Sequence, residues 1–183
     1  GMMGISCYLC SSVYECLQVF AFWFTLGVAI MWTLLEYVQH RFVLHQELHL
    51  DPNEPWSQAA GERNADYFSR HIHHHVFMNQ RFRIALNLRC YAEYLLGGLA
   101  LFHVFLEPRV LYMLAAGWIT GSLAYDGIHL AFHFEDMYQP PFAWYQDMKS
   151  AHMRHHYRDN SREFGVTTAV WDQVMGTEKH IKN

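Results

Sequence analysis

The residues of this chain whose types and spacing could do chemistry are its histidines. Of 183 residues, 14 are histidine, and most of them fall in four short clusters. The clusters are H-x-x-x-x-H at His40 and His45, H-x-x-H-H at His71, His74 and His75, H-x-x-x-H at His129 and His133, and H-x-x-H-H at His152, His155 and His156. Neutral imidazole is a ligand for iron, zinc and copper. The clusters therefore predict a metal site.

The spacing within the clusters predicts how the rings are directed. On a helix, positions i, i+3 and i+4 lie on the same face, so each H-x-x-H-H motif presents three imidazoles together. His40 and His45 are five residues apart, about 140° around an ideal helix, and converge only near a helix end or from opposite sides of a metal. Ten ligands are more than one ion can use. We therefore predict two metals, held by the ten clustered histidines.

Iron and zinc are the two candidate metals. Structural zinc takes four ligands and often uses thiolates, but no cysteine lies within any cluster. A polyhistidine site for two irons fits oxygen chemistry better, and zinc remains the alternative occupant. Cys7 and Cys10 form a lone C-x-x-C, which is a weak zinc signal, and nothing in the cysteine pattern requires an oxidising compartment.

Four histidines are expected to stay outside the site. His73 lies off the three-residue face of its motif, and His49 follows His45 by four residues. His103 stands alone in an apolar stretch, where a hydrogen bond to a neighbouring helix is the simpler role. His180 lies near the end of the sequence.

Three carboxylates are candidates to orient the ligands. A metal-bound histidine usually donates its second N–H to a carboxylate or a carbonyl. Asp126 precedes His129 by three residues and Glu36 precedes His40 by four, while Asp172 lies in a distal segment that could fold back on the site. The alternative for each is an ordinary cap or an interfacial charge.

The elements that position these residues read as membrane helices. Charged residues make up only 16% of the chain, against about 25% in soluble domains. Residues 16–35 carry no charge and are long enough for one transmembrane helix. Residues 91–106 and 110–125 predict a helical hairpin with its tip near Pro108, which crosses the bilayer or only dips into it. We therefore expect an all-α integral membrane helical bundle.

The polar segments 36–89 and 126–183 contain the clusters and complete one domain over residues 1–183. Helices are expected around the histidines of 64–82 and over 143–157. Of the 13 lysines and arginines, six lie in 36–89 and six after Asp126, so the positive-inside rule places this histidine-rich helical cap on the cytosolic or matrix side. A net charge of −4 and a pI near 6.4 give no reason to expect nucleic-acid binding.

In combination, these motifs resemble the histidine boxes of the fatty acid hydroxylase superfamily, and of fatty acid 2-hydroxylases in particular. The similarity includes Tyr125-Asp126 before the third cluster and the closing segment Phe164-Gly-Val-Thr-Thr-Ala-Val-Trp-Asp172, and it covers roughly residues 30–178. The sterol enzymes of the superfamily carry a shorter first box. Carotene hydroxylases share the longer first box but not the second histidine four residues after His129.

The resemblance implies a di-iron centre that activates O2 and inserts one oxygen at an acyl C–H bond, often at the 2-position of a sphingolipid. It also implies an acyl-lipid substrate in the bilayer, an external electron donor such as cytochrome b5, and the endoplasmic reticulum, with the mitochondrial inner membrane as the alternative. The chain departs from the pattern in having no b5-like heme domain and a longer linker between His45 and His71. That linker is expected to line the substrate entrance.

Two other functions stay open at this point. The chain could be a sterol or carotenoid oxidase of the same superfamily, which product analysis would distinguish. It could also be a non-catalytic subunit of a membrane complex that keeps the fold and the metal site. Purification with metal in a stable complex that makes no oxygenated lipid would favour the subunit.

Overall fold

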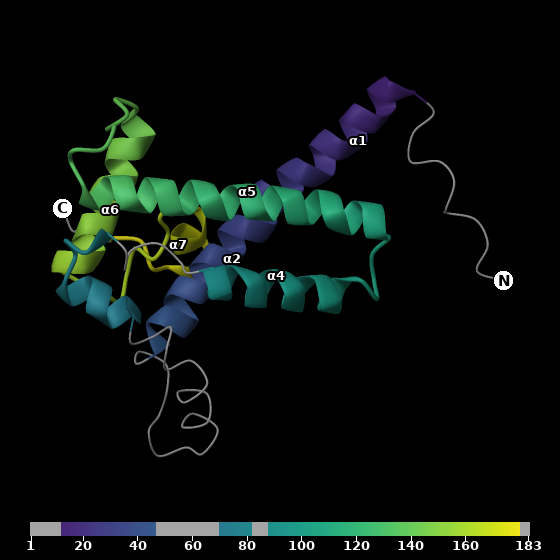
Figure 1. Ribbon diagram of the computed structural model, residues 1–183. Coiled ribbons are helices and arrows are strands. Elements are labelled where there is room, and N and C mark those ends of the chain that lie inside the picture. The colour runs from purple at the N-terminus through teal and green to yellow at the C-terminus, as the bar shows by residue number, and fades with distance from the viewer. Residues whose placement is uncertain (1–11, 47–69, 82–87, 180–183) are drawn as a thin grey trace, which may run out of the picture. The chain divides into compact units, whose positions relative to one another are not determined.

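The computed structural model of the protein describes residues 12–46, 70–81 and 88–179. Every regular element within these ranges is helical, and they contain no strand (Figure 1). The expected all-α class is therefore confirmed for the described part of the chain.

The first element is a continuous helix of 32 residues, Val13–Leu44. It consists of α1 (Val13–Leu26), the π-helical segment η1 (Gly27–Trp32), α2 (Thr33–Val38) and a second π-helical segment, η2 (Gln39–Leu44). Ser12 caps its start by accepting a hydrogen bond from the backbone N–H of Glu15 at 3.2 Å. The helix extends beyond the predicted 16–35 at both ends. Cys16, near its start, is disulfide-bonded, which the cysteine spacing did not indicate.

This helix is long and apolar enough to cross a membrane. Its most apolar window has a mean hydropathy of 1.7, and only 11% of that window is buried. The core helix of a soluble protein would be mostly buried, whereas Leu17, Phe22 and Ile30 are at least half exposed here. It is the one helix in the described ranges that passes this test.

The predicted hairpin corresponds to two helices, α4 (Leu88–Phe102) and α5 (Pro108–His133). The helix expected to end at residue 106 ends at Phe102, and Pro108 begins the next helix, so the turn between them lies close to the predicted tip. Proline is favoured in a first helical turn because it has no N–H to leave unpaired. Glu107 completes this start by accepting hydrogen bonds from the backbone N–H groups of Arg109 and Val110. Whether the pair crosses a bilayer stays a prediction.

The chain divides into two compact units, and the first contains residues up to Trp32 together with 88–121. Within this unit, α1 and η1 approach α5 closely through glycine. A Cβ atom added at Gly117 would lie 2.1 Å from the carbonyl oxygen of Phe24, and one added at Gly27 would lie 2.3 Å from that of Leu114. Small residues that let two backbones touch are typical of helix pairs in membranes.

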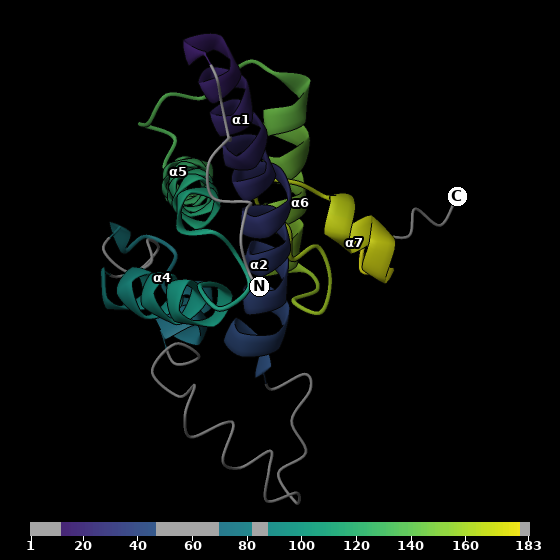
Figure 2. The same cartoon turned by 90° about the vertical axis from the view of Figure 1, so that its right-hand side faces the viewer.

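The second unit contains residues 33–87 and 122–183. Its described elements are α2, η2, a helical segment at 70–76, the end of α5, α6 (Ala143–Tyr157) and α7 (Val170–Met175). The bounds of α6 are those predicted. Of the helix expected around 64–82, residues 70–76 are helical, while 64–69 and 82 lie outside the described ranges. In this unit α7 lies to one side of α2 and α6 (Figure 2), and it contacts α2. The indole N–H of Trp171 donates to Thr33 Oγ1 at 2.9 Å.

The core of the second unit is built largely of histidine. Its side chains with less than 2% exposure include four aromatic rings, those of Tyr37, Phe132, Tyr145 and Phe164. They also include six imidazoles, those of His40, His45, His74, His129, His152 and His155. Buried polar rings need partners to offset their lost hydration. The functional site is therefore part of the core of this unit.

Candidate metal centre

Ten histidines of the second unit converge in two groups of five. The first group, called group one, is His40, His45, His71, His75 and His155. The other, called group two, is His74, His129, His133, His152 and His156. In each group, one nitrogen from every ring lies within 4.8 Å of all the others. The ten residues are those that the sequence singled out, and the structure gathers all of them.

Each H-x-x-H-H motif contributes to both groups. The helical segment at 70–76 gives His71 and His75 to group one and His74 to group two. α6 does the reverse, giving His155 to group one and His152 with His156 to group two. The rings at i and i+4 therefore serve one group while the ring at i+3 serves the other. The three imidazoles on one helix face are therefore divided between the two groups.

The first cluster reaches its group through a π-helical turn. In η2 the backbone N–H of His45 donates to the carbonyl oxygen of His40 at 3.1 Å, an i to i+5 hydrogen bond. Such a turn brings residues five apart to the same side, and turns of this kind recur at functional sites. The ring centroids of His40 and His45 are 5.2 Å apart. The two rings therefore converge at a helix end, one of the two ways that the sequence allowed, because His45 is the residue that caps η2. The angle of about 140° holds for an ideal α-helix and does not apply to this turn.

The nitrogen spacing fits a bound metal ion. Nε2 of His71 lies 3.0 Å from Nε2 of both His45 and His75. In group two, Nε2 of His152 lies 2.9 Å from that of His133 and 3.0 Å from that of His156. Two nitrogens bound at right angles to one ion, each at about 2.1 Å, lie about 3.0 Å apart. Group one and group two could therefore each hold a metal ion.

Burial keeps these imidazoles neutral, which is the form that binds a metal. Loss of hydration lowers the pKa of His74 to about 3 and that of His155 to about 4. Burial also lowers the pKa of His152 well below its ordinary value, and the neighbouring His129 and His156 add to this effect. Neither ring nitrogen of His74 or of His129 has a hydrogen-bond partner within the described ranges. A metal ion would give these buried nitrogens the partner they lack.

Backbone carbonyls hold the far side of two group-one rings. Nδ1 of His40 lies 2.5 Å from the carbonyl oxygen of Phe164, and Nδ1 of His155 lies 2.6 Å from that of Arg162. A proton on Nδ1 leaves the Nε2 lone pair free to face a metal. We call the segment of residues 162–167 the carbonyl strap. The spacing of the histidine boxes gave no signal for it, although its sequence belongs to the closing segment of the resemblance.

Two of the three predicted carboxylates act on the carbonyl strap and not on a histidine ring. Asp172 accepts from the backbone N–H groups of Phe164 and Gly165, and Glu36 accepts from those of Val166 and Thr167. Glu36 and Asp172 therefore act on the rings of His40 and His155 through the backbone, because carbonyl oxygens of the strap lie at Nδ1 of these two rings. Burial raises the pKa of Asp172, and its hydrogen bonds oppose the rise.

The third predicted carboxylate, Asp126, lies half-buried in α5, one turn before His129. Its role in orienting that ring stays a prediction.

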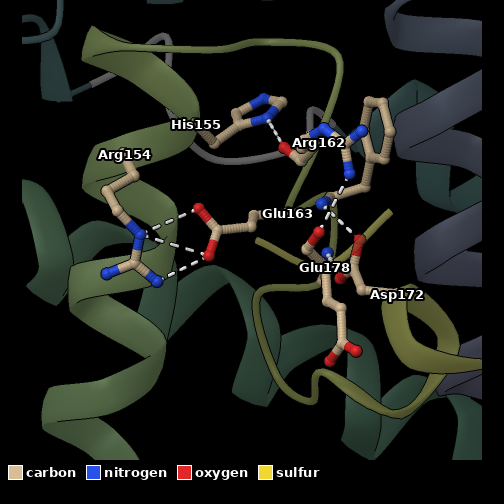
Figure 3. A network of polar contacts seen from close by, with 8 residues as sticks. Arg154, His155, Arg162, Glu163, Asp172 and Glu178 are labelled. Atoms are coloured by element: carbon tan, nitrogen blue, oxygen red, sulfur yellow. Dashed lines mark hydrogen bonds and ion pairs between the residues drawn. The ribbon is translucent and has the colours of Figure 1, made fainter. Parts of the chain in front are cut away.

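An ion pair ties the carbonyl strap to α6. Arg154 donates from Nε and Nη2 to the carboxylate of Glu163 at 2.5–3.2 Å, as Figure 3 shows beside the contact of His155 with Arg162. Glu163 has a φ of 56°, a left-handed conformation that costs non-glycine residues of order 1–3 kcal/mol. The paired, largely buried carboxylate helps to keep the strap in this shape.

Two further histidines in the described ranges, His73 and His103, stand apart from both groups. The ring of His73 points to Phe77, with centroids 4.5 Å apart. His103 is exposed just after α4 and belongs to neither group, and its hydrogen bond to a neighbouring helix stays a prediction. His49, His180, Cys7 and Cys10 lie outside the described ranges.

Comparison with known proteins adds independent support. A family model described as fatty acid hydroxylase matches residues 25–177. A ceramide very long chain fatty acid hydroxylase of Saccharomyces cerevisiae is 29% identical over 96% of this chain and 41% of its own length. The fatty acid 2-hydroxylase of Rattus norvegicus is 30% identical over 87% of this chain and 40% of its own length.

A solved structure of a hydroxylase domain also resembles the chain. A structure of full-length Scs7p in which only the hydroxylase domain is visible superposes with a TM-score of 0.74 at 30% identity, covering 91% of this chain and 58% of that one. The chain thus spans about half the length of the relatives it matches. Its exposed apolar helix, together with these relatives, supports a membrane protein. A match over most of the chain that includes all four histidine clusters leads to one assignment: this chain belongs to the fatty acid hydroxylase family.

Proposed function

We propose that this chain is the catalytic domain of an O2-dependent di-iron hydroxylase that acts on the acyl chain of a lipid, at the 2-position of a ceramide or related sphingolipid. The observation that carries the proposal is the convergence of ten histidines in two groups of five. The names of the relatives, ceramide and fatty acid 2-hydroxylases, favour an acyl chain over a sterol or a carotenoid. The complete set of ten rings favours an enzyme over a subunit that keeps only the fold.

The proposed chemistry needs a redox-active metal and a donor of electrons. Hydroxylation of one C–H bond consumes O2, two electrons and two protons, and it yields the alcohol and one water. Two bound irons would supply the one-electron steps that reduce O2 and attack the C–H bond. Zinc has no redox chemistry, so it would fill the same nitrogens without supporting turnover. The electrons would come from an external protein of the cytochrome b5 type.

The protein's part is to hold the ligands and to limit the access of water. Seven of the ten rings are buried, and the half-buried ones are His75, His133 and His156. His75 of group one stacks on His156 of group two, with centroids 4.0 Å apart. His75 and His156 thus lie where the two groups meet, and the ring of His133 contacts that of His156. We propose that the acyl chain reaches the metals from this side.

We further propose that the histidine clusters face the cytosol or the matrix, with the endoplasmic reticulum as the first candidate membrane. The support is the concentration of basic residues in 36–89 and after Asp126. Accessibility tags placed at Asn53 and at Asn183 are expected to report the same compartment in intact membranes. Opposite compartments would mean that the number of spans is wrong.

The metal content tests the proposal directly. The chain, purified reduced and without chelator, is expected to hold close to two irons, because each group offers five neutral imidazoles to one ion. Quantitative elemental analysis against protein concentration measures this ratio. Protein that holds no transition metal, even after incubation with ferrous iron, would rule out the assignment of the ten ligands.

A further inference from the structure

The two histidine groups differ in what holds the far side of their rings. In group one, Nδ1 of His40 and Nδ1 of His155 lie within 2.6 Å of carbonyl oxygens two residues apart in the carbonyl strap. In group two, Nδ1 of four rings has no hydrogen-bond partner within the described ranges, and these rings belong to His74, His129, His152 and His156. Both rings that are held by a carbonyl of the strap belong to group one, and these four rings with an unpaired Nδ1 all belong to group two.

The strap is itself held from two sides. Its four consecutive backbone N–H groups, from residue 164 to 167, all donate to buried carboxylates. Asp172 accepts from the N–H groups of residues 164 and 165 at 2.9 and 2.8 Å. Glu36 accepts from those of residues 166 and 167 at 2.5 and 2.8 Å. Glu36 also accepts from the hydroxyl of Thr167. Glu36 lies one helical turn before His40, on the same helix. Glu36 therefore fixes the strap, and a carbonyl of the strap in turn orients His40.

A hydrogen bond at Nδ1 matters because it fixes both the tautomer and the rotation of a ligand ring. A ring that is held this way offers Nε2 to the metal without first being ordered, and it is also a better donor to the metal. A ring without such a bond has to be ordered when the metal binds. Loss of one such outer partner typically weakens metal binding about 10–100-fold.

We infer that the two groups hold their metals unequally: the metal of group two leaves first, and Glu36 is a positioning residue that keeps the metal of group one in place through the carbonyl strap. The inference rests on the proposed function only in that the ten histidines bind two metals. It does not depend on which lipid is oxidised, or on whether any lipid is oxidised.

The test is the release of iron to a chromophoric ferrous chelator. The full chain in detergent is loaded anaerobically with two equivalents of iron(II), mixed with excess chelator, and followed by absorbance. We expect two phases of equal amplitude, with rates about 10–100-fold apart. Glu36→Ala is expected to bring the slow phase close to the fast one and to leave the fast phase unchanged.

Two variants serve as controls. Glu36→Gln keeps an oxygen for the N–H groups of Val166 and Thr167, and the hydroxyl of Thr167 can turn to accept from the new amide, so the slow phase should return. Glu178→Gln removes an exposed carboxylate that lies near the strap but faces away from it (Figure 3), and it should behave as wild type. Circular dichroism of each variant shows whether the helices persist.

The outcomes separate the inference from the proposed function. A single release phase for two bound irons, or an effect of Glu36→Ala on the fast phase, would overturn the inference and leave the hydroxylase proposal intact. A chain that takes up no iron would overturn both. Two phases of which only the slow one responds to Glu36→Ala and recovers in Glu36→Gln would establish Glu36 as the positioning residue.

Discussion

The His74→Ala chain is expected to make hydroxylated lipid only at background level and to hold fewer than two irons. His74 comes from the 70–76 helical segment, whose other ligands serve group one, yet it completes group two with His129 and His133. Its ring is nearly fully buried, so alanine removes a ligand and leaves a cavity in the core. Product formation is measured by lipid mass spectrometry and normalised to folded protein, because a lost metal also destabilises a site built into the core.

The adjacent residue supplies the matched control. His73 lies in the same helical segment and packs on Phe77 instead of pointing into either group, so His73→Ala should keep both irons and most of the activity. His103→Ala, at an exposed position after α4, should do the same. Full hydroxylation by His74→Ala would show that group two is not part of the catalytic centre.

Replacing Asp172 with Asn is expected to destabilise the second unit, although the two side chains have nearly the same shape. Oδ1 of Asp172 accepts from the N–H of Phe164 and the hydroxyl of Thr177, while Oδ2 accepts from the N–H of Gly165. An amide nitrogen at either position would face at least one N–H donor and leave it without an acceptor. Each unsatisfied buried donor costs about 1–3 kcal/mol, and Asp172→Ala should cost more than Asp172→Asn.

Thermal unfolding of the purified chain in detergent measures this effect. Asp147→Asn, at an exposed position of α6, is the control and should unfold at the wild-type temperature. The slow phase of iron release should also be lost in Asp172→Asn, because Asp172 is one of the two carboxylates that accept the N–H groups of the carbonyl strap. Wild-type stability and release in this variant would mean that the strap does not depend on Asp172.

Helical spacing alone identified most of the site. The i, i+3 and i+4 positions of the two H-x-x-H-H motifs select rings that lie on one helix face, and the ten clustered histidines are the ten that converge. α6 was predicted with its observed bounds because Pro140 and Pro141 stand just before it and polar residues follow it. Such patterns are local, so they can be read without knowing how the helices pack.

What the sequence could not predict depends on packing between distant segments. The division of each motif between the groups depends on how the helices are rotated against one another, which spacing within one helix does not determine. The π-helical turn at His40 and His45 changes the period on which the angular estimate was based. The carbonyls of Arg162 and Phe164 are backbone groups, so no side-chain pattern marks them, and they reach residues up to 124 positions away in the sequence.

The most direct test of the central claim follows the oxygen atom. Cells that contain the wild-type chain or the His74→Ala chain are grown under 18O2, and their sphingolipids are analysed by mass spectrometry. If the two histidine groups form an O2-activating centre, the wild-type chain produces 2-hydroxylated acyl chains that carry one 18O atom and the variant produces none above background. A wild-type chain that holds two irons, has its electron donor present and adds no 18O to any lipid would contradict the account.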